Sequence, residues 1–494
     1  MRLDTEACWR AFSTRDRRFE GRFVAGVTST GIYCRPGCPA RLPKRGHLRF
    51  FACPAAAEED GFRPCLRCRP DAAPGSPAWH GAAATVRRGL RLIAEGGLDG
   101  QDVEHLAARL GVTSRHVRRL FQQHLGASPQ AIAHTRRVHF ARRLIDETEL
   151  PMTEVALGAG FSSLRRFNHA IRDTFRRAPR ELRRGRGRHP APGSIELRVP
   201  VREPFDDGVF AFLAARAVPG VEAAAGDEYR RSFEVRTPSG AGARGTFAVA
   251  WTRGEPALRV RVFMREPREL ISIVDRVARM FDANADATAI AAHLGRDPVL
   301  APTLRKIPGL RLPGAWDPFE LAVRAILGQQ VTVAGARTLA GRLALAFGEP
   351  LNAQARDEIT HLFPTPEALA RADLARIGLP AARASALRSF ARAVVDGTLS
   401  LDPPDDLESA VSRLTALPGI GDWTAHYIAM RGFGEPDAFP AGDLGVRRAL
   451  AGNGRLPSVK EVEARAEPWR PWRAYAVMAL WRRTPSRSNE KEKS

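Results

Sequence analysis

The sequence predicts a multidomain protein that is mainly helical, with smaller α+β parts. Its 494 residues suggest three or four domains, at roughly 150 residues per domain. Hydrophobic residues make up 44% of the chain, enough for each domain to bury a core, which excludes a disordered chain. The apolar spacing changes along the chain: it is helical from about residue 82 to 182, alternates from residue 195 to about 263, and becomes helical again from about residue 267.

Breaks in composition define the expected domains. Residues 1–78 hold every cysteine, and the stretch 183–194 lacks apolar residues, which is typical of a linker. Leu197 and Val199 alternate with polar residues, as a half-buried strand requires. The expected domains are 1–78, 82–183, 195–300 and 301–483, followed by a disordered tail at 484–494.

The charge balance favours a polyanionic partner. Lys and Arg number 76 against 54 Asp and Glu, a net charge of +22. Residues 81–188 alone carry 21 arginines against 10 acids, which is too uneven for a general arginine bias. No apolar run approaches the roughly 18 residues that span a bilayer, and the N-terminus lacks a signal-like core. We therefore expect a cytoplasmic protein that binds nucleic acid and no membrane.

Four of the six cysteines have the spacing of a metal site. They form two close pairs, Cys34-x3-Cys38 and Cys65-x2-Cys68, which can supply four thiolates to one tetrahedral Zn²⁺. Cys8 and Cys53 are the odd ones out. A purely structural zinc site is the simpler interpretation of the spacing, yet a zinc-bound thiolate is also a good nucleophile towards alkyl groups.

The residues around these pairs resemble the zinc domain of the Ada adaptive-response regulators. The matching stretches are Gly31-Ile32-Tyr33-Cys34-Arg35-Pro36-Gly37-Cys38-Pro39-Ala40-Arg41 and Gly61-Phe62-Arg63-Pro64-Cys65-Leu66-Arg67-Cys68. The resemblance implies that Cys34 accepts a methyl group irreversibly from a methylated DNA phosphate, with Cys38, Cys65 and Cys68 as the other zinc ligands. Methylation turns an anionic thiolate into a neutral thioether, which raises DNA affinity. Ada regulators usually carry a second alkyltransferase cysteine, but no cysteine follows Cys68 here.

Residues 102–177 contain two helix–turn–helix patterns. Gly111-Val112-Thr113 separates a helix at 102–110 from one at 114–124, and Gly160-Phe161-Ser162 separates 152–159 from 163–173. The basic side chains expected on the outer faces, and therefore at DNA, are Arg115, Arg118, Arg119, Arg165, Arg166, His169 and Arg172.

The apolar side chains of the last helix, Leu164, Phe167 and Ile171, are expected to face inward. An ordinary helical bundle with solvated arginines is the alternative for one such pattern. Two patterns joined by a long helix at 129–146 resemble the double helix–turn–helix of AraC-type regulators. In Ada this unit directly follows the zinc domain, as it does here.

Leu417-Pro418-Gly419-Ile420-Gly421 predicts a tight turn between two helices. The free amides at Gly419 and Gly421 can hold a DNA phosphate at the start of the next helix. Asp443 lies 22 residues after Gly421, before a predicted helix at 444–451, where the helix dipole keeps a carboxylate ionised. From spacing alone, an N-cap aspartate without a chemical role is the simpler interpretation.

Together these motifs resemble the helix-hairpin-helix DNA glycosylases, and among them the AlkA-type glycosylases of alkylated bases. Residues 325–331, 425–432 and 469–475 match, and the strand-rich residues 195–280 resemble the N-terminal domain of the same enzymes. The resemblance implies a catalytic Asp443. It also implies that the base pocket is lined by Trp423, Tyr427 and Trp481, with Trp316 as a further candidate, and that Gln330 fills the gap left by the flipped base.

The chemistry fits that resemblance. A carboxylate stabilises the oxocarbenium-like sugar that forms as an N-glycosidic bond breaks, and aromatic faces attract a cationic methylated purine. Enzymes that also cut the strand carry a lysine where this sequence has Trp423, so we expect a monofunctional glycosylase that needs no cofactor for base excision.

The sequence thus predicts a sensor, a regulator and a repair enzyme in one chain. Its expected domains are a small zinc-bound domain, an AraC-like double helix–turn–helix, a strand-rich AlkA-like domain and an all-α helix-hairpin-helix domain. Its expected partners are double-stranded DNA, carrying alkylated bases, methyl phosphotriesters or promoter sequence, and RNA polymerase. Two alternatives stay open: a regulator whose glycosylase domain only binds DNA, and a glycosylase whose front half only anchors it to DNA.

Overall fold

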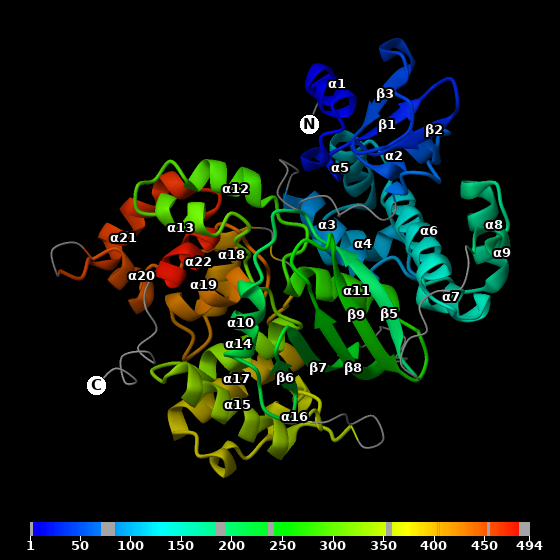
Figure 1. The fold of residues 1–494 in the computed structure, drawn as a ribbon. Helices are drawn as coiled ribbons and strands as arrows, with labels where there is room; N and C mark the ends of the chain where they lie inside the picture. Colours follow the sequence, from blue (N-terminus) through cyan, green and yellow to red (C-terminus); the bar gives the residue numbers. More distant parts are fainter. Residues whose placement is uncertain are drawn as a thin grey trace. The chain divides into compact units, whose positions relative to one another are not determined.

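The computed structural model describes most of the chain in two compact units. The described residues are 3–70, 84–183, 193–235, 242–351, 358–402, 404, 406–451 and 455–483. The first unit comprises Met1–Arg202 and Phe233–Ala278, and the second comprises Glu203–Ser232 and Arg279–Ser494 (Figure 1). The predicted tail, 484–494, and residues 184–192 of the predicted linker lie outside the described residues.

The N-terminal part of the first unit is a small four-stranded sheet with two helices. Asp4 caps the first helix by accepting hydrogen bonds from the backbone of Glu6 and Ala7. The strand order is β3-β1-β2-β4, with β1 antiparallel to β2 and β3, and β2 parallel to β4. The elements are α1 (Thr5–Ser13), β1 (Val24–Val27), β2 (Ile32–Cys34), β3 (Leu48–Phe51), α2 (Pro54–Glu59) and β4 (Arg63–Pro64).

In the described residues from 84 to 183 seven helices follow, and they contain both predicted helix–turn–helix units. Side chains of Asp102, Thr113, Ser128 and Ser163 cap α4, α5, α6 and α8, and Gly111 turns the chain with φ of 70°. The long helix α6 joins the two helix–turn–helix units, as predicted. The helices are α3 (Ala84–Ala94), α4 (Val103–Leu110), α5 (Ser114–Leu125), α6 (Pro129–Glu147), α7 (Met152–Gly158), α8 (Leu164–Phe175) and α9 (Pro179–Leu182).

The first unit also contains three antiparallel strands in the order β5-β9-β8. These are β5 (Ile195–Pro200), β8 (Ala243–Ala250) and β9 (Ala257–Met264), and α11 (Leu270–Met280) follows them. Leu197 pairs with Val260, and Val199 with Leu258, all at most 3% exposed, so the predicted alternation is confirmed for these positions.

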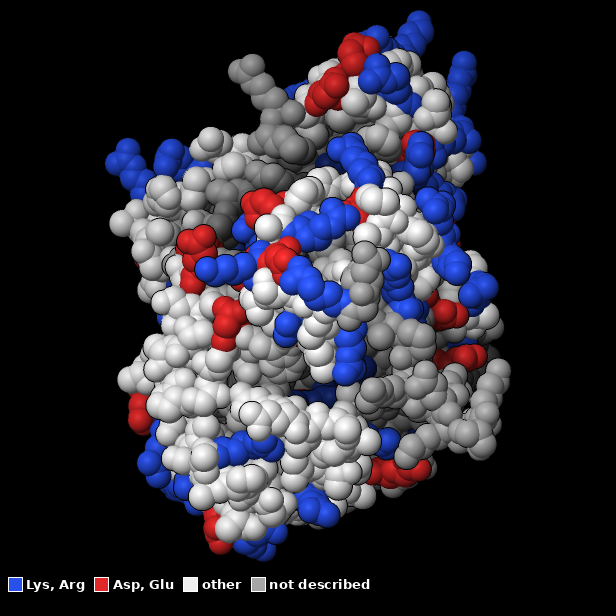
Figure 2. Space-filling model, turned by 90° about the vertical axis from the view of Figure 1, so that its left-hand side faces the viewer, with Lys and Arg blue, Asp and Glu red and all other residues white. Residues whose placement is uncertain are grey.

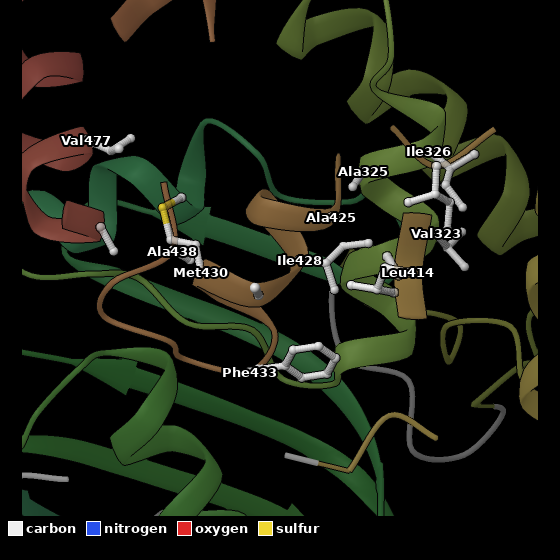
Figure 3. Packing of buried hydrophobic residues seen from close by; sticks show 14 of the residues in the cluster. Val323, Ala325, Ile326, Leu414, Ala425, Ile428, Met430, Phe433, Ala438 and Val477 are labelled. Carbon is white, nitrogen blue, oxygen red and sulfur yellow. The ribbon is translucent and has the colours of Figure 1, made fainter. Parts of the chain in front are cut away.

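The second unit is built around one helical core. Val323 and Ile326 of α14, Leu414 of α18 and Ile428 of α19 lie close together in that core (Figure 3). The hairpin strands β6 (Glu222–Ala225) and β7 (Glu228–Val235) begin in this unit. Its helices are α10 (Gly208–Ala214), α12 (Ala287–Leu294), α13 (Ala301–Lys306), α14 (Pro318–Leu327), α15 (Val333–Phe347), α16 (Pro366–Arg371), α17 (Ala381–Val395), α18 (Leu407–Thr415), α19 (Asp422–Arg431), α20 (Leu444–Ala449), α21 (Val459–Ala466) and α22 (Arg473–Arg483).

Among the residues described, no helix combines the length and the apolar character that crossing a bilayer would require.

Candidate functional site

The four predicted cysteines come together because β2 and β4 are neighbours. Cys34 ends β2 and Cys65 follows β4, and the backbone N–H of Cys65 donates to the Tyr33 carbonyl at 3.0 Å. The Sγ atoms of Cys34, Cys38, Cys65 and Cys68 all lie within 4.8 Å of one another. Cys53 lies apart from this cluster, where its Sγ donates to the Leu125 carbonyl at 3.4 Å.

The four-cysteine cluster fits a zinc ion. Thiolates about 2.3 Å from a tetrahedral Zn²⁺ are about 3.8 Å from one another, which is within the separation found here. The four side chains are only 2–8% exposed, so the cluster is a closed set of sulfur donors. Hydrogen bonds among the four thiols lower the pKa of Cys38 and Cys65 and raise the pKa of Cys34 and Cys68, so the four groups titrate as one coupled set.

Both recognition helices present their basic side chains to solvent. Arg115 and Arg119 on α5 are exposed, as are Arg165, Arg166, His169 and Arg172 on α8. Arg118 is exposed too and pairs with Glu104 at 3.2 Å. The exposed basic side chains of α5 and α8 suit contact with the DNA phosphate backbone and the major groove. Lys and Arg also cover more of the surface than Asp and Glu on the face drawn in Figure 2, which is the left-hand side of Figure 1.

One expectation for α8 is wrong. Phe167 and Ile171 are fully buried, but Leu164 is 40% exposed. Ser163 is the N-cap, so Leu164 is the first helical residue. Its side chain therefore leaves the helix in the open first turn, beside Arg165, and does not reach the core.

Asp443 is held at the N-terminus of α20 by three donors. Its Oδ1 accepts from the backbone N–H of Val446 and from the indole N–H of Trp481, both at 2.9 Å. Its Oδ2 accepts from the indole N–H of Trp423 at 3.0 Å. Asp443 is thus an N-cap, as the simpler interpretation required, but two predicted pocket residues also hold its carboxylate.

The predicted pocket aromatics form one continuous group. The rings of Trp423 and Tyr427 stack at 5.3 Å with an interplanar angle of 11°, and Tyr427 lies 6.4 Å from Trp481. Phe212 of α10 stacks on Trp481 at 6.3 Å. Sequence reasoning missed Phe212, because more than 200 positions separate it from the other rings and no local pattern connects them.

Two arginines, Arg431 and Arg216, contact this aromatic group. Arg431, which is 4% exposed, donates to the Tyr427 hydroxyl at 2.7 Å and to the carbonyls of Pro313 and Gly314. Its guanidinium and that of Arg216 lie 4.8 and 3.7 Å from the Phe212 ring centre. Burial raises the pKa of Tyr427, but these two cations outweigh it and lower that pKa below its ordinary value.

The predicted turn at 417–421 is bonded to Gln329, the neighbour of the predicted gap-filling Gln330. Gly419 has φ of 83°, and a Cβ there would lie 2.5 Å from Ala386, so the turn needs glycine. The Gln329 side chain donates to the Gly419 carbonyl at 2.8 Å. The adjacent Gln330 is exposed, with φ of 58°, and Gly421 is the exposed N-cap of α19. Gln330 is thus positioned on the surface beside the hairpin.

Trp316, the further pocket candidate, lies in the interior of the second unit. It is 5% exposed, and its ring lies 5.5 Å from the guanidinium of Arg231. Arg231 in turn pairs with the buried carboxylates of Glu222 and Glu320. Trp316 therefore packs on a buried ion network.

Four family models match successive parts of the chain. They are the metal binding domain of Ada at residues 7–71, a helix-turn-helix domain at 106–185, the AlkA N-terminal domain at 196–317, and the HhH-GPD superfamily of base excision DNA repair proteins at 323–471.

Curated relatives and a solved structure extend these matches. A probable bifunctional transcriptional activator/DNA repair enzyme AlkA of Mycobacterium tuberculosis is 43% identical over 487 residues, covering 97% of each chain. DNA-3-methyladenine glycosylase 2 of Escherichia coli is 36% identical, covering 56% of this chain and 94% of its own. The 3-methyladenine DNA glycosylase of Archaeoglobus fulgidus shares the fold, with a TM-score of 0.50 at 22% identity over 57% of this chain and 96% of its own.

Proposed function

The chain belongs to the family of bifunctional AlkA-type transcriptional activators and DNA repair enzymes, and on this basis we propose which residues carry out each activity. Asp443 drives the release of 3-methyl and 7-methyl purines from DNA. Cys34 takes one methyl group irreversibly from a methylated DNA phosphate, and α5 and α8 read promoter DNA. The observation that carries base release is the Asp443 carboxylate, held by Trp423, Trp481 and the start of α20.

The held carboxylate acts on the sugar. As the N-glycosidic bond breaks, its electron pair leaves with the cationic purine, and Asp443 stabilises the positive charge that develops on the sugar. A carboxylate has about four acceptor positions, and three are filled by the donors from Trp423, Trp481 and Val446. The remaining position can orient the water that adds to the sugar and leaves an abasic site.

The aromatic group recognises the flipped base. The stacked faces of Trp423 and Tyr427 attract a purine whose ring carries positive charge. Gln330, exposed beside the hairpin, fills the gap in the duplex, and the amides at Gly419 and Gly421 bind the phosphate backbone. Trp423 stands where a strand-cutting relative has lysine, so the activity ends at base release and needs no cofactor.

Methyl transfer uses the four-cysteine cluster. One zinc ion, when bound, keeps the coordinating sulfurs deprotonated at neutral pH. The Cys34 sulfur forms a bond to the methyl carbon while the carbon–oxygen bond breaks, and the electron pair of that bond stays on the phosphate. The product is a neutral thioether and an ordinary phosphodiester. Loss of the thiolate charge strengthens binding to DNA, where contact with RNA polymerase then activates transcription.

One incubation tests both activities. The purified protein is mixed with duplex DNA treated with a methylating agent. Freed 7-methylguanine and 3-methyladenine are then measured by mass spectrometry, and methyl on Cys34 is measured by peptide mapping. We expect both products from the parent chain. A Cys34→Ser variant should release bases without becoming methylated at residue 34. No freed purine would refute the glycosylase assignment, and methyl on another cysteine would refute the role of Cys34.

A further inference from the structure

One face of α6 carries a row of polar side chains in the interior of the first unit. Thr135, His139, Arg142 and Asp146 follow one another at helical spacings of four, three and four residues, so they lie on one side of the helix. Thr135 is 7% exposed and Arg142 1% exposed, and the side chain of Asp146 is 8% exposed. We call these four residues the α6 polar row.

The first half of the row binds the strand that carries Cys34. The Glu58 carboxylate of α2 accepts from the Tyr33 hydroxyl at 2.8 Å and lies 3.1 Å from Nε2 of His139. Thr135 donates to its other oxygen at 2.5 Å. Burial raises the pKa of Glu58. The hydrogen bond and charge of His139, together with the hydrogen bonds from Thr135 and Tyr33, outweigh burial and lower this pKa below its ordinary value. Tyr33 immediately precedes Cys34 in β2.

The second half of the row binds the segment that carries Cys68. Asp146 forms ion pairs with Arg142 and with Arg69, the residue that follows Cys68. Arg142 also donates to the Leu182 carbonyl at 3.0 Å, and its guanidinium lies 5.9 Å from the Phe175 ring of α8. Residues adjacent to two of the four clustered cysteines are therefore tied to the helix that joins the two helix–turn–helix units.

We propose that the α6 polar row is the joint through which methylation at Cys34 acts on promoter binding, an inference that rests on the proposed function. Charge interactions at a DNA surface are screened within about 8–10 Å at physiological salt. A change of charge at Cys34 therefore alters promoter affinity fully only if Cys34 is held at a fixed place relative to α5 and α8. Glu58 and Asp146 are in this sense positioning residues.

A joint of this kind predicts a specific separation of effects. Weakening it should leave the chemistry within the small zinc domain unchanged, since Glu58 touches no clustered cysteine in the contacts described. It should reduce the gain in DNA affinity that methylation produces, because a zinc domain that is held less firmly must be ordered again when it contributes to binding. A role limited to stabilising the fold would change neither quantity selectively.

The test compares Glu58→Gln with the parent chain. The probe for binding is a duplex selected from a random-sequence pool by the methylated parent. Affinity is measured by fluorescence anisotropy before and after methylation by an oligonucleotide with one methyl phosphotriester, and zinc content and the rate of methyl transfer are measured alongside. Glu6→Gln is the matched control, because it makes the same charge change at an exposed ion pair with Arg45 in the same domain.

We expect Glu58→Gln to accept methyl at a rate within twofold of the parent rate. The increase in DNA affinity on methylation should be at least fivefold smaller in Glu58→Gln than in the parent, and unchanged in Glu6→Gln. If Glu58→Gln loses its zinc, Tyr33→Phe, which removes one hydroxyl, decides the question by the same measurements. An undiminished gain in Glu58→Gln, or in Tyr33→Phe where that variant decides, overturns the joint. A parent chain that takes up no methyl, or gains no affinity, instead overturns the proposed function.

Discussion

Gly445 offers a way to disturb the hold on Asp443 without changing either partner. A Cβ at this position would lie 3.0 Å from Oδ1 of Asp443 and 3.2 Å from Cδ1 of Trp481. Both separations are tighter than ordinary contacts between such atoms, so in Gly445→Ala one neighbour must move by a few tenths of an ångström. The indole of Trp481 would then move away from the carboxylate that it now meets at 2.9 Å.

The size of the effect follows from that one hydrogen bond. A hydrogen bond to a charged group contributes about 1.5–3 kcal/mol, so weakening it by about half costs on the order of 1 kcal/mol. If that loss falls on the transition state, the rate of base release drops about fivefold. Alanine is the better helix former by up to about 1 kcal/mol, so the fold should not be weakened appreciably.

The assay is single-turnover release of 7-methylguanine from methylated duplex DNA. Gly442→Ala is the control, because no atom lies within 4 Å of its added Cβ and its backbone is not in the left-handed region. The control should stay within twofold of the parent. Equal rates for the two variants would show that the contact between Trp481 and Asp443 does not support base release.

Three further outcomes are expected. Removing zinc with a chelator should abolish methyl transfer but leave base release within about twofold, because the second unit contains no cysteine; loss of both would contradict this division. Leu164→Ala should change the free energy of unfolding by less than about 0.5 kcal/mol, since the side chain is 40% exposed, whereas urea titration would show about 2–5 kcal/mol for an inward leucine. Burial raises the pKa of Asp282 to about 6. Between about pH 4 and pH 6 the folded protein therefore keeps a proton on Asp282 that the unfolded chain releases. The stability that this proton binding contributes is lost as the pH rises from about 4 to about 6. Asp282→Asn should flatten the pH dependence of unfolding between pH 4 and 6 by up to about 3 kcal/mol, and an unchanged slope would refute the shift.

Local sequence patterns were enough to predict the cysteine cluster, the helices with their caps, and the alternation along the strands. The spacing of Cys34, Cys38, Cys65 and Cys68 was enough to expect one cluster, and the sheet brings these sulfurs together. Capping residues such as Asp102 and Thr113 begin the helices that the sequence indicated. Alternating residues such as Leu197 and Val260 face the core as strands require.

Long-range contacts could not be predicted in the same way. Trp423 and Trp481 were expected to stack on a base, but their hydrogen bonds to Asp443 depend on how three helices pack. The joint between Glu58 and His139 links positions 81 residues apart with no shared pattern. The prediction for Leu164 was wrong because helical spacing does not show where a helix begins. Ser163 is the N-cap of α8, so Leu164 lies in its first turn.

Base release, as proposed here, depends on the negative charge of Asp443, which stabilises the sugar from which the base departs. Asp443→Asn keeps the size of the side chain and one acceptor oxygen for the α20 cap, but removes the charge. The decisive measurement is single-turnover release of 7-methylguanine by this variant, with DNA binding measured in parallel. We expect a rate at least 100-fold below that of the parent, with affinity for DNA retained. Release at the parent rate would contradict it.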